Sequence, residues 1–507
     1  MKRSLNTLFW VATIGLFFTA CSKKDDPQPK SGTGKTEKLV EKTAEEELNE
    51  KVHNHLRTYY LYNDEYKTLN PNFKQTYDKF LTNTLMSMKT NVLDKKKNSK
   101  GKYQLFSYIE KLDPNLTGGS GTSSSRAAVE AKEKEYTFGI AAATPFLTNI
   151  NVNGQVKKVV VFSIKGIYPG SPAEKAGLKR GDDIVMYNGE YKDSITWYDP
   201  YVEFLLPSKA GITAKMKTKA GKEVKLTTVA MECNPILKTH IYKKGRYTIG
   251  YLVYESFDSG FDEELFEIFK KFKTSGVTDL IIDLRYNGGG DVQSANLIAT
   301  CTAGDQSLDK VFASFEYNPT RMKSIVKDEY KFSRTYKNLH DISLSEGYLN
   351  LKKVYCLVSG STASSSELVI NSLRGIDVDV VLIGTTTHGK NVGMEVVELE
   401  DKDKNKYRLA PITFKSANAK GFSAYEMGFK PNIELDEVEN NRKDQIFQGF
   451  GDFATAEEIM YARAIKEITS EAPASTASRA GVRKQLPLGK ALTAPQRPAK
   501  GMRKYNL

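Results

Sequence analysis

Cysteine and tryptophan are scarce in this chain, which has 4 cysteines and 2 tryptophans among its 507 residues. One cysteine, Cys21, lies near the N-terminus, and the others are Cys233, Cys301 and Cys356. An odd remainder without metal-like spacing excludes a full disulfide framework and a zinc knuckle. One pair of these three could form a bridge, but buried thiols are what we expect. The sequence therefore predicts no metal site.

Long apolar runs are absent except for one near the N-terminus. Lys2 and Arg3 precede an apolar run over residues 8–18, which is too short for a comfortable membrane span and is typical of an export signal. Its end, Phe18-Thr19-Ala20-Cys21, resembles a bacterial lipobox with Phe18 in place of the usual Leu. The resemblance implies a signal peptide over residues 1–21 and a lipid on Cys21. An uncleaved N-terminal anchor is the alternative. Either way we expect a cell-envelope protein, facing the periplasm or exposed on the outer membrane.

The net charge of +13 is concentrated in the last residues of the chain. Eight Lys and Arg residues after residue 470 face the single acid Glu471, so the remaining residues are close to neutral. A strongly basic folded face would be the sign of nucleic-acid binding, and the sequence shows none. We expect no nucleic-acid partner.

Composition and periodicity divide the chain into segments. A polar stretch rich in Lys, Asp, Pro, Ser and Gly predicts a flexible tether, and the Ala-, Pro- and Arg-rich end predicts a disordered basic tail. Leu48, Val52 and Leu56 recur at helical spacing, which predicts a small helical domain. The predicted segments are the tether 22–42, the helical domain 43–117, a β-rich unit 135–232, an α/β unit 240–467 and the tail 468–507.

A run of small residues, Ser359 to Ser366, directly follows the apolar run 354–358 and precedes a helical pattern. This arrangement predicts a sharp strand-to-helix turn, which would expose a hydroxyl and aim the N–H groups of the helix start at the same place. Such a turn suits a nucleophile beside an oxyanion pocket. A Ser/Thr-rich turn before a helix is also the usual form of an N-cap, so the motif alone is weak.

A lysine follows the next apolar run. Lys390 lies in the loop Thr387-His388-Gly389-Lys390, just after residues 380–384. A free lysine has a pKa of about 10.4, but burial in an apolar pocket disfavours its charged form and yields an amine that can accept a serine proton. Read alone, Lys390 is more readily interpreted as a surface loop lysine.

Three glycines, Gly288 to Gly290, follow the strand-like run 280–284 and let the backbone approach a ligand closely. The loop lacks the Lys-Ser/Thr of a P-loop and the spacing of a dinucleotide fingerprint.

Taken in order, these elements resemble the S41 family of carboxyl-terminal-processing, or tail-specific, serine peptidases. The resemblance covers roughly residues 135 to 440 and includes the Asp283-Leu284-Arg285-Tyr286-Asn287 strand end and Gly428-Phe429-Lys430-Pro431-Asn432. It implies a ClpP/crotonase-like α/β peptidase domain without a cofactor. It also implies that Ser364 is the nucleophile and Lys390 its base, with the N–H groups of Gly290 and Ser365 forming the oxyanion hole and Gly289 as the fallback.

One position departs from the family pattern. Several members carry, four residues after the base, a Gln that orients it, and here that residue is Met394. Glu367 is our candidate for the orienting residue, with Glu395 as an alternative. His388 suggests a Ser–His pair instead, but no Asp partner is evident.

The β-rich unit resembles a PDZ domain through Tyr168-Pro169-Gly170-Ser171-Pro172, the short helix from Ala173, and Gly181-Asp182-Asp183. PDZ domains bind the C-termini of polypeptides by adding the peptide as a strand. Phe138, Gly139 and Ile140 stand where the carboxylate-binding loop should be. A β-rich spacer is the alternative.

The sequence therefore predicts a lipid-anchored serine endopeptidase that cleaves unfolded or C-terminally tagged proteins bound through their C-termini. The alternative is a catalytically weak or inactive PDZ-containing scaffold or chaperone on the same fold. A surface lipoprotein that captures glycans or peptides ranks behind, because Trp197 is the only tryptophan outside the signal. The substrate and the oligomeric state do not follow from the sequence.

Overall fold

A computed structural model of the chain describes residues from 42 to 504 with gaps, and the described residues from 43 onward belong to one compact unit. The predicted signal peptide with Cys21 lies outside the described residues, as does the predicted tether except residue 42. Within the described part, no helix has both the length and the apolar character to cross a membrane. The described residues are 42–97, 101–116, 132–325, 327–336, 339, 341–440, 442–443, 446–447, 449–470, 490–492 and 501–504.

The N-terminal part begins with helices, as the periodicity predicts. Helix α1 (Ala44–Tyr59) starts at a capping box, in which Thr43 and Glu46 exchange hydrogen bonds of 2.9 and 3.1 Å. The helices end at Ser87, and short strands follow instead of further helix. The remaining elements are α2 (Asn63–Tyr66), α3 (Tyr77–Ser87), η1 (Val92–Asp94), β1 (Lys95–Lys97), β2 (Tyr103–Leu105) and β3 (Tyr108–Lys111).

The β-rich unit is built on a long hairpin of β5 (Ile140–Val152) and β6 (Gln155–Ile167). Its sheet has the order β28-β5-β6-β7-β8-β9, so a strand from the C-terminal tail forms one edge. The other elements are β4 (Lys134–Thr137), α4 (Pro172–Lys175), β7 (Asp183–Tyr187), α5 (Tyr198–Leu205), β8 (Thr213–Thr218), β9 (Glu223–Thr227), β10 (Val229–Glu232) and β28 (Lys490–Ala491).

The α/β unit is centred on a six-stranded sheet with the order β11-β12-β13-β19-β20-β25. Every neighbouring pair from β12 onward is parallel, and β11 pairs antiparallel with β12. The strands are β11 (Ile236–Lys244), β12 (Tyr247–Tyr254), β13 (Asp279–Asp283), β19 (Lys353–Val358), β20 (Asp379–Gly384) and β25 (Ile433–Glu434).

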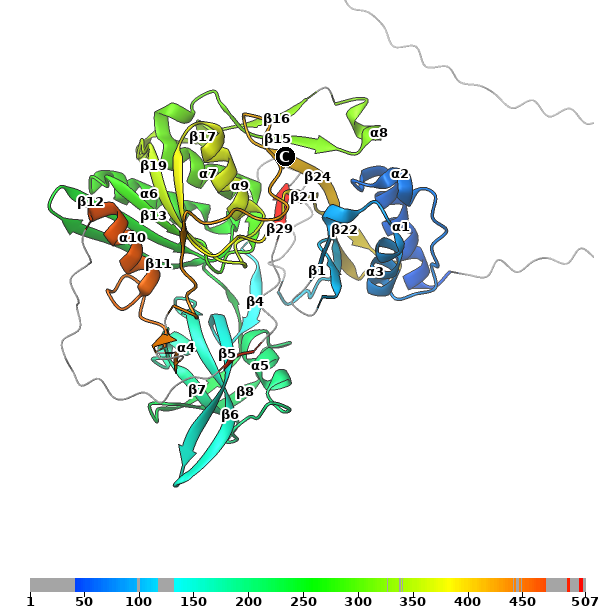
Figure 1. Ribbon diagram of the computed structural model, residues 1–507. Helices are drawn as coiled ribbons and strands as arrows, with labels where there is room; N and C mark the ends of the chain where they lie inside the picture. Colours follow the sequence, from blue (N-terminus) through cyan, green and yellow to red (C-terminus); the bar gives the residue numbers. More distant parts are fainter. Residues whose placement is uncertain are drawn as a thin grey trace, which may run out of the picture. The chain divides into compact units, whose positions relative to one another are not determined.

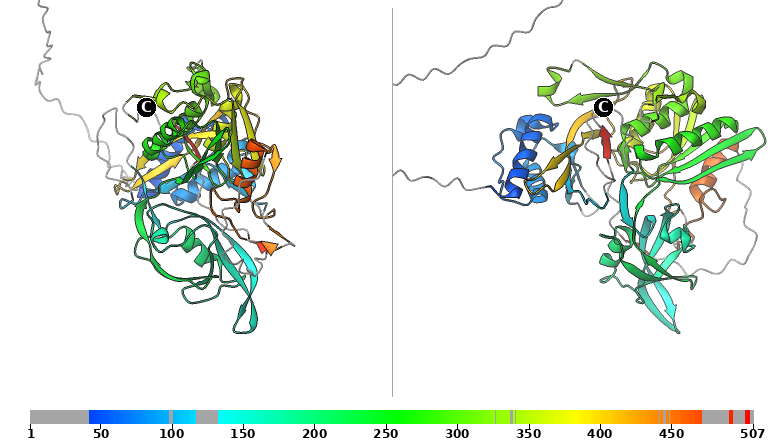
Figure 2. Two further views of the ribbon diagram at one scale, coloured as in Figure 1. Left: turned by 90° about the vertical axis from the view of Figure 1, so that its left-hand side faces the viewer. Right: turned by 180° about the vertical axis from the view of Figure 1, so that it is seen from behind.

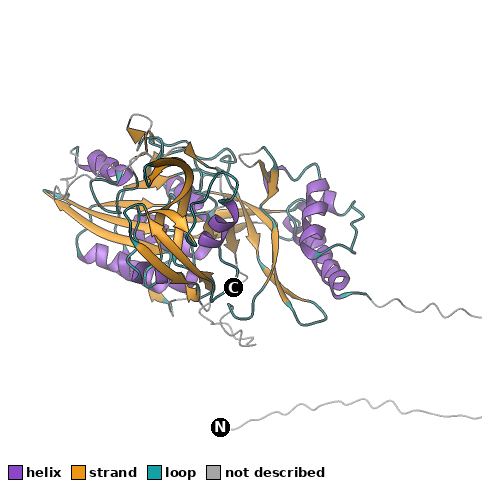
Figure 3. Cartoon of the chain, turned by 90° about the horizontal axis from the view of Figure 1, so that it is seen from below, coloured by secondary structure: helices purple, strands orange, loops and turns teal. Residues whose placement is uncertain are grey.

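Alternate residues of these strands face two separate cores, which is why they read as continuous apolar runs. On one face, Ile282, Cys356 and Leu382 pack with side chains of three helices. On the other, Ile281, Leu357 and Ile383 pack with the last helix. The helices flank the strands in Figures 1 and 3. They are α6 (Asp262–Thr274), α7 (Val292–Ala303), α9 (Ser365–Gly375) and, on the second face, α10 (Ile459–Thr469).

A second six-stranded sheet has the order β14-β29-β21-β24-β15-β16 and again includes a strand of the tail. A third sheet, β22-β23-β3, joins the N-terminal part to the α/β unit. The elements are β14 (Gly289–Asp291), β15 (Val311–Tyr317), β16 (Asp328–Lys331), β21 (Val392–Glu395), β22 (Val397–Glu400), β23 (Lys406–Ala410), β24 (Ile412–Ala417) and β29 (Gly501–Lys504). Shorter ones are η2 (Ser259–Phe261), η3 (Gly304–Ser307), α8 (Pro319–Met322), β17 (Thr335–Tyr336), β18 (Ile342–Ser343), η5 (Leu344–Gly347), β26 (Arg442–Lys443) and β27 (Ile446–Phe447).

The mixed α/β fold with N-terminal helices is the predicted class. The tail differs from its prediction of disorder, because 490–491 and 501–504 form strands. Cys233, Cys301 and Cys356 are buried and form no disulfide among the described residues, and buried thiols are what we expected.

Candidate active site

Three loops meet at one edge of the main sheet. They follow β13, β19 and β20, which are parallel neighbours, so their carboxyl ends lie side by side. The first loop holds the glycines, the second Ser364 and the third Lys390. The fold therefore brings together the three elements that are far apart in the sequence.

The loops after β13 and β19 are tied by hydrogen bonds to backbone carbonyls. The Asn287 carbonyl accepts from the Ala363 N–H at 3.1 Å and from the Ser366 hydroxyl at 3.0 Å. The Ser365 hydroxyl donates to the Gly290 carbonyl at 2.6 Å. The serine-rich sequence thus supplies donors that fix the turn against the glycine loop.

Ser364 occupies a strained backbone conformation immediately before α9, with φ of 60° and ψ of −113°. Non-glycine residues held in such regions concentrate at functional sites. We expected the turn to expose the hydroxyl, and this is wrong for the present conformation, since Ser364 has no exposed surface. Close packing explains the burial, because a Cβ built on Gly289 would lie only 2.8 Å from the Ser364 Cβ. The Ser364 Oγ is buried and makes no hydrogen bond to any described residue.

Glu367 joins the second loop to the third. Its buried carboxylate accepts from the N–H groups of Ser364 at 2.9 Å and Lys390 at 2.8 Å. It also accepts from the Gly389 N–H and the Thr387 hydroxyl, both at 2.6 Å. Burial raises the pKa of Glu367, while these donors act in the opposite direction. Glu367 therefore holds the backbone of both Ser364 and Lys390 in place.

The Lys390 side chain is buried, with 2% of its surface exposed. Its Nζ lies 4.7 Å from the centroid of the Phe106 ring, which belongs to the N-terminal part. A second lysine of that part, Lys96, donates to the His388 carbonyl in the same loop. Burial lowers the pKa of Lys96, and the Glu367 charge opposes this shift. No motif in the sequence indicates that residues so far upstream cover the lysine loop.

His388 is held by backbone rather than by a carboxylate. Its Nδ1 lies 3.2 Å from the Gly360 carbonyl oxygen. Burial and the positive charge of Lys96 lower the pKa of the His388 imidazole to about 4. The ring is therefore neutral at pH 7, and no Asp among the described residues orients it.

Met394 is fully buried in an apolar cluster and cannot orient an amine. The alternative orienting residue, Glu395, forms an ion pair with Arg321 at 2.5 Å. The carboxylate of Glu395 is therefore engaged by Arg321.

The two candidate glycine donors differ. The Gly289 N–H is already donated to the Asn287 side chain at 2.8 Å. Gly290 has φ of 139°, and a Cβ there would lie 1.9 Å from the Phe257 carbonyl oxygen. A side chain at this position is thereby excluded, which explains the glycine.

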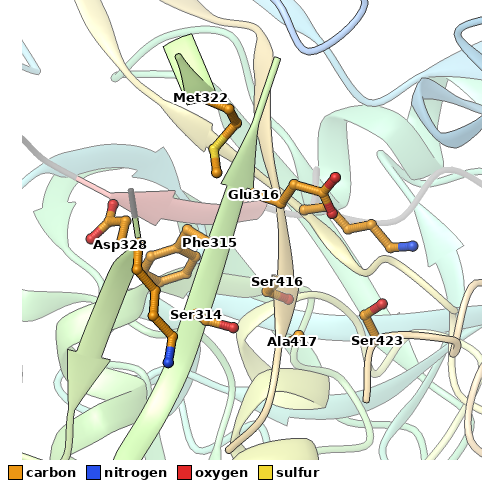
Figure 4. Close-up of a pocket in the computed structure, with 10 residues that line it drawn as sticks. Ser314, Phe315, Glu316, Met322, Asp328, Ser416, Ala417 and Ser423 are labelled. Atoms are coloured by element: carbon orange, nitrogen blue, oxygen red, sulfur yellow. The ribbon is translucent and has the colours of Figure 1, made fainter. Parts of the chain in front are cut away.

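A cavity of about 190 Å³ lies next to the third loop. Ser364 and Lys390 are not among its lining residues. Phe315, Ser416 and Ser423 line it, from β15, β24 and the following loop (Figure 4). The Ser416 N–H donates to the carbonyl of Asn391, the residue after Lys390, at 3.0 Å. The cavity borders the site without being part of it. No cluster of metal-ligating side chains occurs among the residues that the structure describes.

Comparison with known proteins finds two matching domain families. Residues 248–435 match peptidase family S41, and residues 163–199 match the PDZ domain family. The protein has an S41 peptidase domain and a PDZ domain.

Curated relatives of this protein are named as processing proteases. A carboxyl-terminal-processing peptidase 1 from Arabidopsis thaliana is 26% identical over 246 residues, covering 48% of this chain and 46% of the relative. The carboxy-terminal processing protease CtpA of Bacillus subtilis is 26% identical over 269 residues, covering 53% and 52%. The matches thus span about half the length of these relatives. A Bacteroides fragilis NCTC 9343 protein assigned to the S41 proteases shares the fold, with a TM-score of 0.62, 24% identity and coverage of 83% of this chain and 97% of that one.

The predicted peptide-binding residues of the PDZ domain lie in its core rather than on its surface. Phe138 and Ile140 are fully buried, and the Gly139 N–H donates to the Thr137 hydroxyl at 2.8 Å. A Cβ on Gly139 would meet the Ser171 Oγ at 2.1 Å. These residues therefore shape the loop that leads into strand β5.

A buried ion network joins the PDZ and S41 peptidase domains. Arg180 of the PDZ domain pairs with Glu437 and donates to the Tyr286 hydroxyl at 2.7 Å and the Gly451 carbonyl at 2.8 Å. Arg285 contacts Glu437 at 3.0 Å and Glu458 at 2.8 Å. Sequence analysis missed this network because its members are dispersed along the chain. Because Tyr286 lies just before the glycine loop in the chain, its contact with Arg180 places that arginine beside the loop.

Proposed function

We propose that the protein is a serine endopeptidase that cleaves unfolded or C-terminally tagged proteins in the cell envelope through Ser364 and Lys390. The observation that carries this proposal is the shared Glu367 carboxylate, which ties the backbone of Ser364 to that of Lys390 at the edge of the sheet. The S41 domain and the names of the curated relatives support the same reaction.

In this mechanism the Ser364 Oγ attacks the peptide carbonyl while the Lys390 amine accepts its proton. The lysine then passes that proton to the leaving amine, and water releases the acyl group by the same route. The N–H groups of Gly290 and Ser365 stabilise the oxyanion. Gly290 is favoured over Gly289, whose N–H is already donated to Asn287.

The Ser364 Oγ has no hydrogen-bond partner among the described residues, and in the proposed mechanism substrate binding brings it within hydrogen-bond reach of the Lys390 Nζ. Hydrogen bonds between catalytic groups often tighten only in the substrate complex. Glu367 serves here as a positioning residue that acts on the two backbones rather than on the amine.

The test is cleavage of a labelled unfolded protein by the purified protein and its variants. Ser364→Ala and Lys390→Met should each reduce kcat/KM by about 10³-fold or more. Ser372→Ala is a matched control, since Ser372 is a buried serine of α9, the helix that Ser364 precedes, and its hydroxyl also has no partner among the described residues. Lys466→Met, an exposed lysine of α10, controls for the loss of charge. Unchanged cleavage in both active-site variants would refute the dyad, and no cleavage by the native protein would favour the scaffold alternative.

For the PDZ domain we propose capture of substrate C-termini by strand addition at β5. Binding can be measured by fluorescence anisotropy on the full-length Ser364→Ala variant. A peptide with a free carboxylate should bind more tightly than its amidated form, and equal binding would argue against carboxylate recognition.

For localisation we propose a lipid anchor on Cys21, which rests on the lipobox-like sequence alone. Cells fed a clickable fatty acid should label the native protein and not Cys21→Ala. Labelling of the variant would contradict the proposal.

A further inference from the structure

The C-terminal tail returns to the folded part of the protein at two places, and the first is the PDZ domain. Strand β28 pairs antiparallel with β5, with Lys490 opposite Leu147 and Ala491 opposite Phe146. The Leu492 N–H continues the pairing by donating to the Pro145 carbonyl at 2.8 Å. The Leu492 side chain packs against the PDZ core. The tail therefore occupies the sheet edge at which a PDZ domain adds a peptide strand.

The second place is the candidate active site. Strand β29 runs parallel to both β14 and β21 and lies between them. Met502 is opposite Gly290 on one side and Gly393 on the other. Strand β29 also lies against α9, the helix that Ser364 precedes. It is the red arrow beside β21 in Figure 1, and the red arrow is seen from behind in the right-hand view of Figure 2.

Strands β14 and β21 have no direct pairing with each other, because β29 separates them in the sheet order. Without β29, each would present an unpaired strand edge to an incoming peptide. One edge contains the proposed oxyanion donor Gly290, and the other begins two residues after Lys390. A peptide in this slot would be held by its backbone, which suits substrates of varied sequence. Ser364 is fully buried while the tail fills the slot.

We infer that the tail is an internal ligand of the enzyme, which restrains the peptidase by occupying both the PDZ edge and the slot between β14 and β21. The inference rests on the proposed function, because it treats that slot as the substrate site. A tethered segment acts at an effective concentration in the millimolar range, so a dilute substrate competes poorly with it. Substrates that displace the tail from the PDZ edge would also weaken its hold on the slot.

The experiment compares cleavage of fluorescein-labelled β-casein by the full-length protein and by forms with an altered tail. A form ending at residue 489 lacks both strands, and we expect its kcat/KM to rise about tenfold or more. Met502→Pro keeps the full length but removes one backbone N–H donor from β29, so it should also raise kcat/KM. Ala480→Pro places the same residue type in the tail outside both strands and should leave the rate unchanged.

A binding measurement separates this inference from the proposed reaction. A labelled peptide of residues 490–507 is added to the shortened form that carries Ser364→Ala, and fluorescence anisotropy reports its binding without catalysis. We expect binding to the shortened form and at least tenfold weaker binding to the full-length one, whose own tail competes. Native turnover that depends on Ser364 but stays the same after truncation and in Met502→Pro would overturn the inference while the proposed function stands. Peptide binding without any β-casein cleavage would support the tail as a ligand and refute the proposed function.

Discussion

The S41 domain meets its two neighbours through contacts of opposite chemistry. Against the PDZ domain lies a charged joint, in which Lys165, Arg180 and Arg285 surround Glu437 and Glu458. Against the N-terminal part lies an apolar joint, in which side chains of α1 and α3 pack on β21, β23 and β24. Both joints are buried. Among the described residues, strand pairing between β3 and β23 reinforces the apolar joint.

Each joint reaches a different half of the candidate site. The charged joint touches Tyr286, next to Asn287 and the glycine loop. The apolar joint contains Val392 and Met394 from the strand after Lys390. A buried ion network depends on every member, whereas an apolar cluster loses stability in proportion to the volume removed. A single substitution in the charged joint should therefore strongly perturb the oxyanion side of the site. Substitutions in the apolar joint should perturb the lysine side in proportion to the volume that they remove.

The largest effect should come from Arg180→Met, which removes the cation that spans the charged joint. Glu437 and Glu458 would lose a buried partner, and breaking such a pair typically costs about 3–5 kcal/mol. Tyr286 would lose the donor to its hydroxyl, so kcat should fall as well. Chemical denaturation and β-casein turnover measure the two effects. A stability loss below about 1 kcal/mol would show that the network does not hold the two domains together.

Acid should weaken the charged joint selectively. Burial alone would raise the pKa of Glu437, but the charges of Lys165, Arg285 and Arg180 outweigh it and hold the pKa well below 4.5. A lowered carboxyl pKa gives stability that is present above the ordinary pKa and is lost as pH falls below it. Glu437→Gln should thus be destabilising at pH 7 by about 1.5–3 kcal/mol, with a smaller difference from the native protein near pH 3.

The apolar joint supplies the control for this pH series. Leu56→Ala removes a fully buried side chain of that cluster and should cost about 2–4 kcal/mol, with little change between the two pH values. The denaturant midpoints of both variants and of the native protein, measured at pH 7 and near pH 3, test this difference. A pH-dependent loss in Leu56→Ala equal to that in Glu437→Gln would erase the distinction between the joints.

Met394→Gln should have a smaller effect and will show whether the family glutamine can be restored here. The amide would enter a cluster of apolar side chains without a hydrogen-bond partner, which costs about 1–3 kcal/mol. We expect lower stability and no gain in kcat. A higher kcat would mean that the lysine lacks an orienting group that this position can supply. Met394→Leu is the matched control, since it keeps the packing.

Much of the site could be predicted because its chemistry is local in sequence. Buried strands followed by the glycine, Ser364 and Lys390 loops are short motifs, and parallel strands bring their ends together. The burial of Ser364, the reach of Arg180 to Tyr286 and the entry of β29 depend on contacts between distant segments. No periodic pattern marks such contacts, so sequence analysis took the tail to be disordered. Met394 departs from the family pattern in the sequence, and the fold makes it part of the apolar joint.

The smallest expected effect comes from replacing Phe106. Among the described ring contacts, Phe106 is the residue of the N-terminal part that contacts the Lys390 amine. Asp94 holds this ring in place by accepting from the Phe106 N–H at 3.0 Å. Phe106→Leu keeps an apolar cover but removes the ring face, so kcat should change by about tenfold or less while KM stays the same. Phe73→Leu, in the same N-terminal part but away from Lys390, is the control. If both variants alter kcat equally, the apolar joint acts through stability alone. If only Phe106→Leu does, the joint sets the environment of the base, as the charged joint does for the glycine loop.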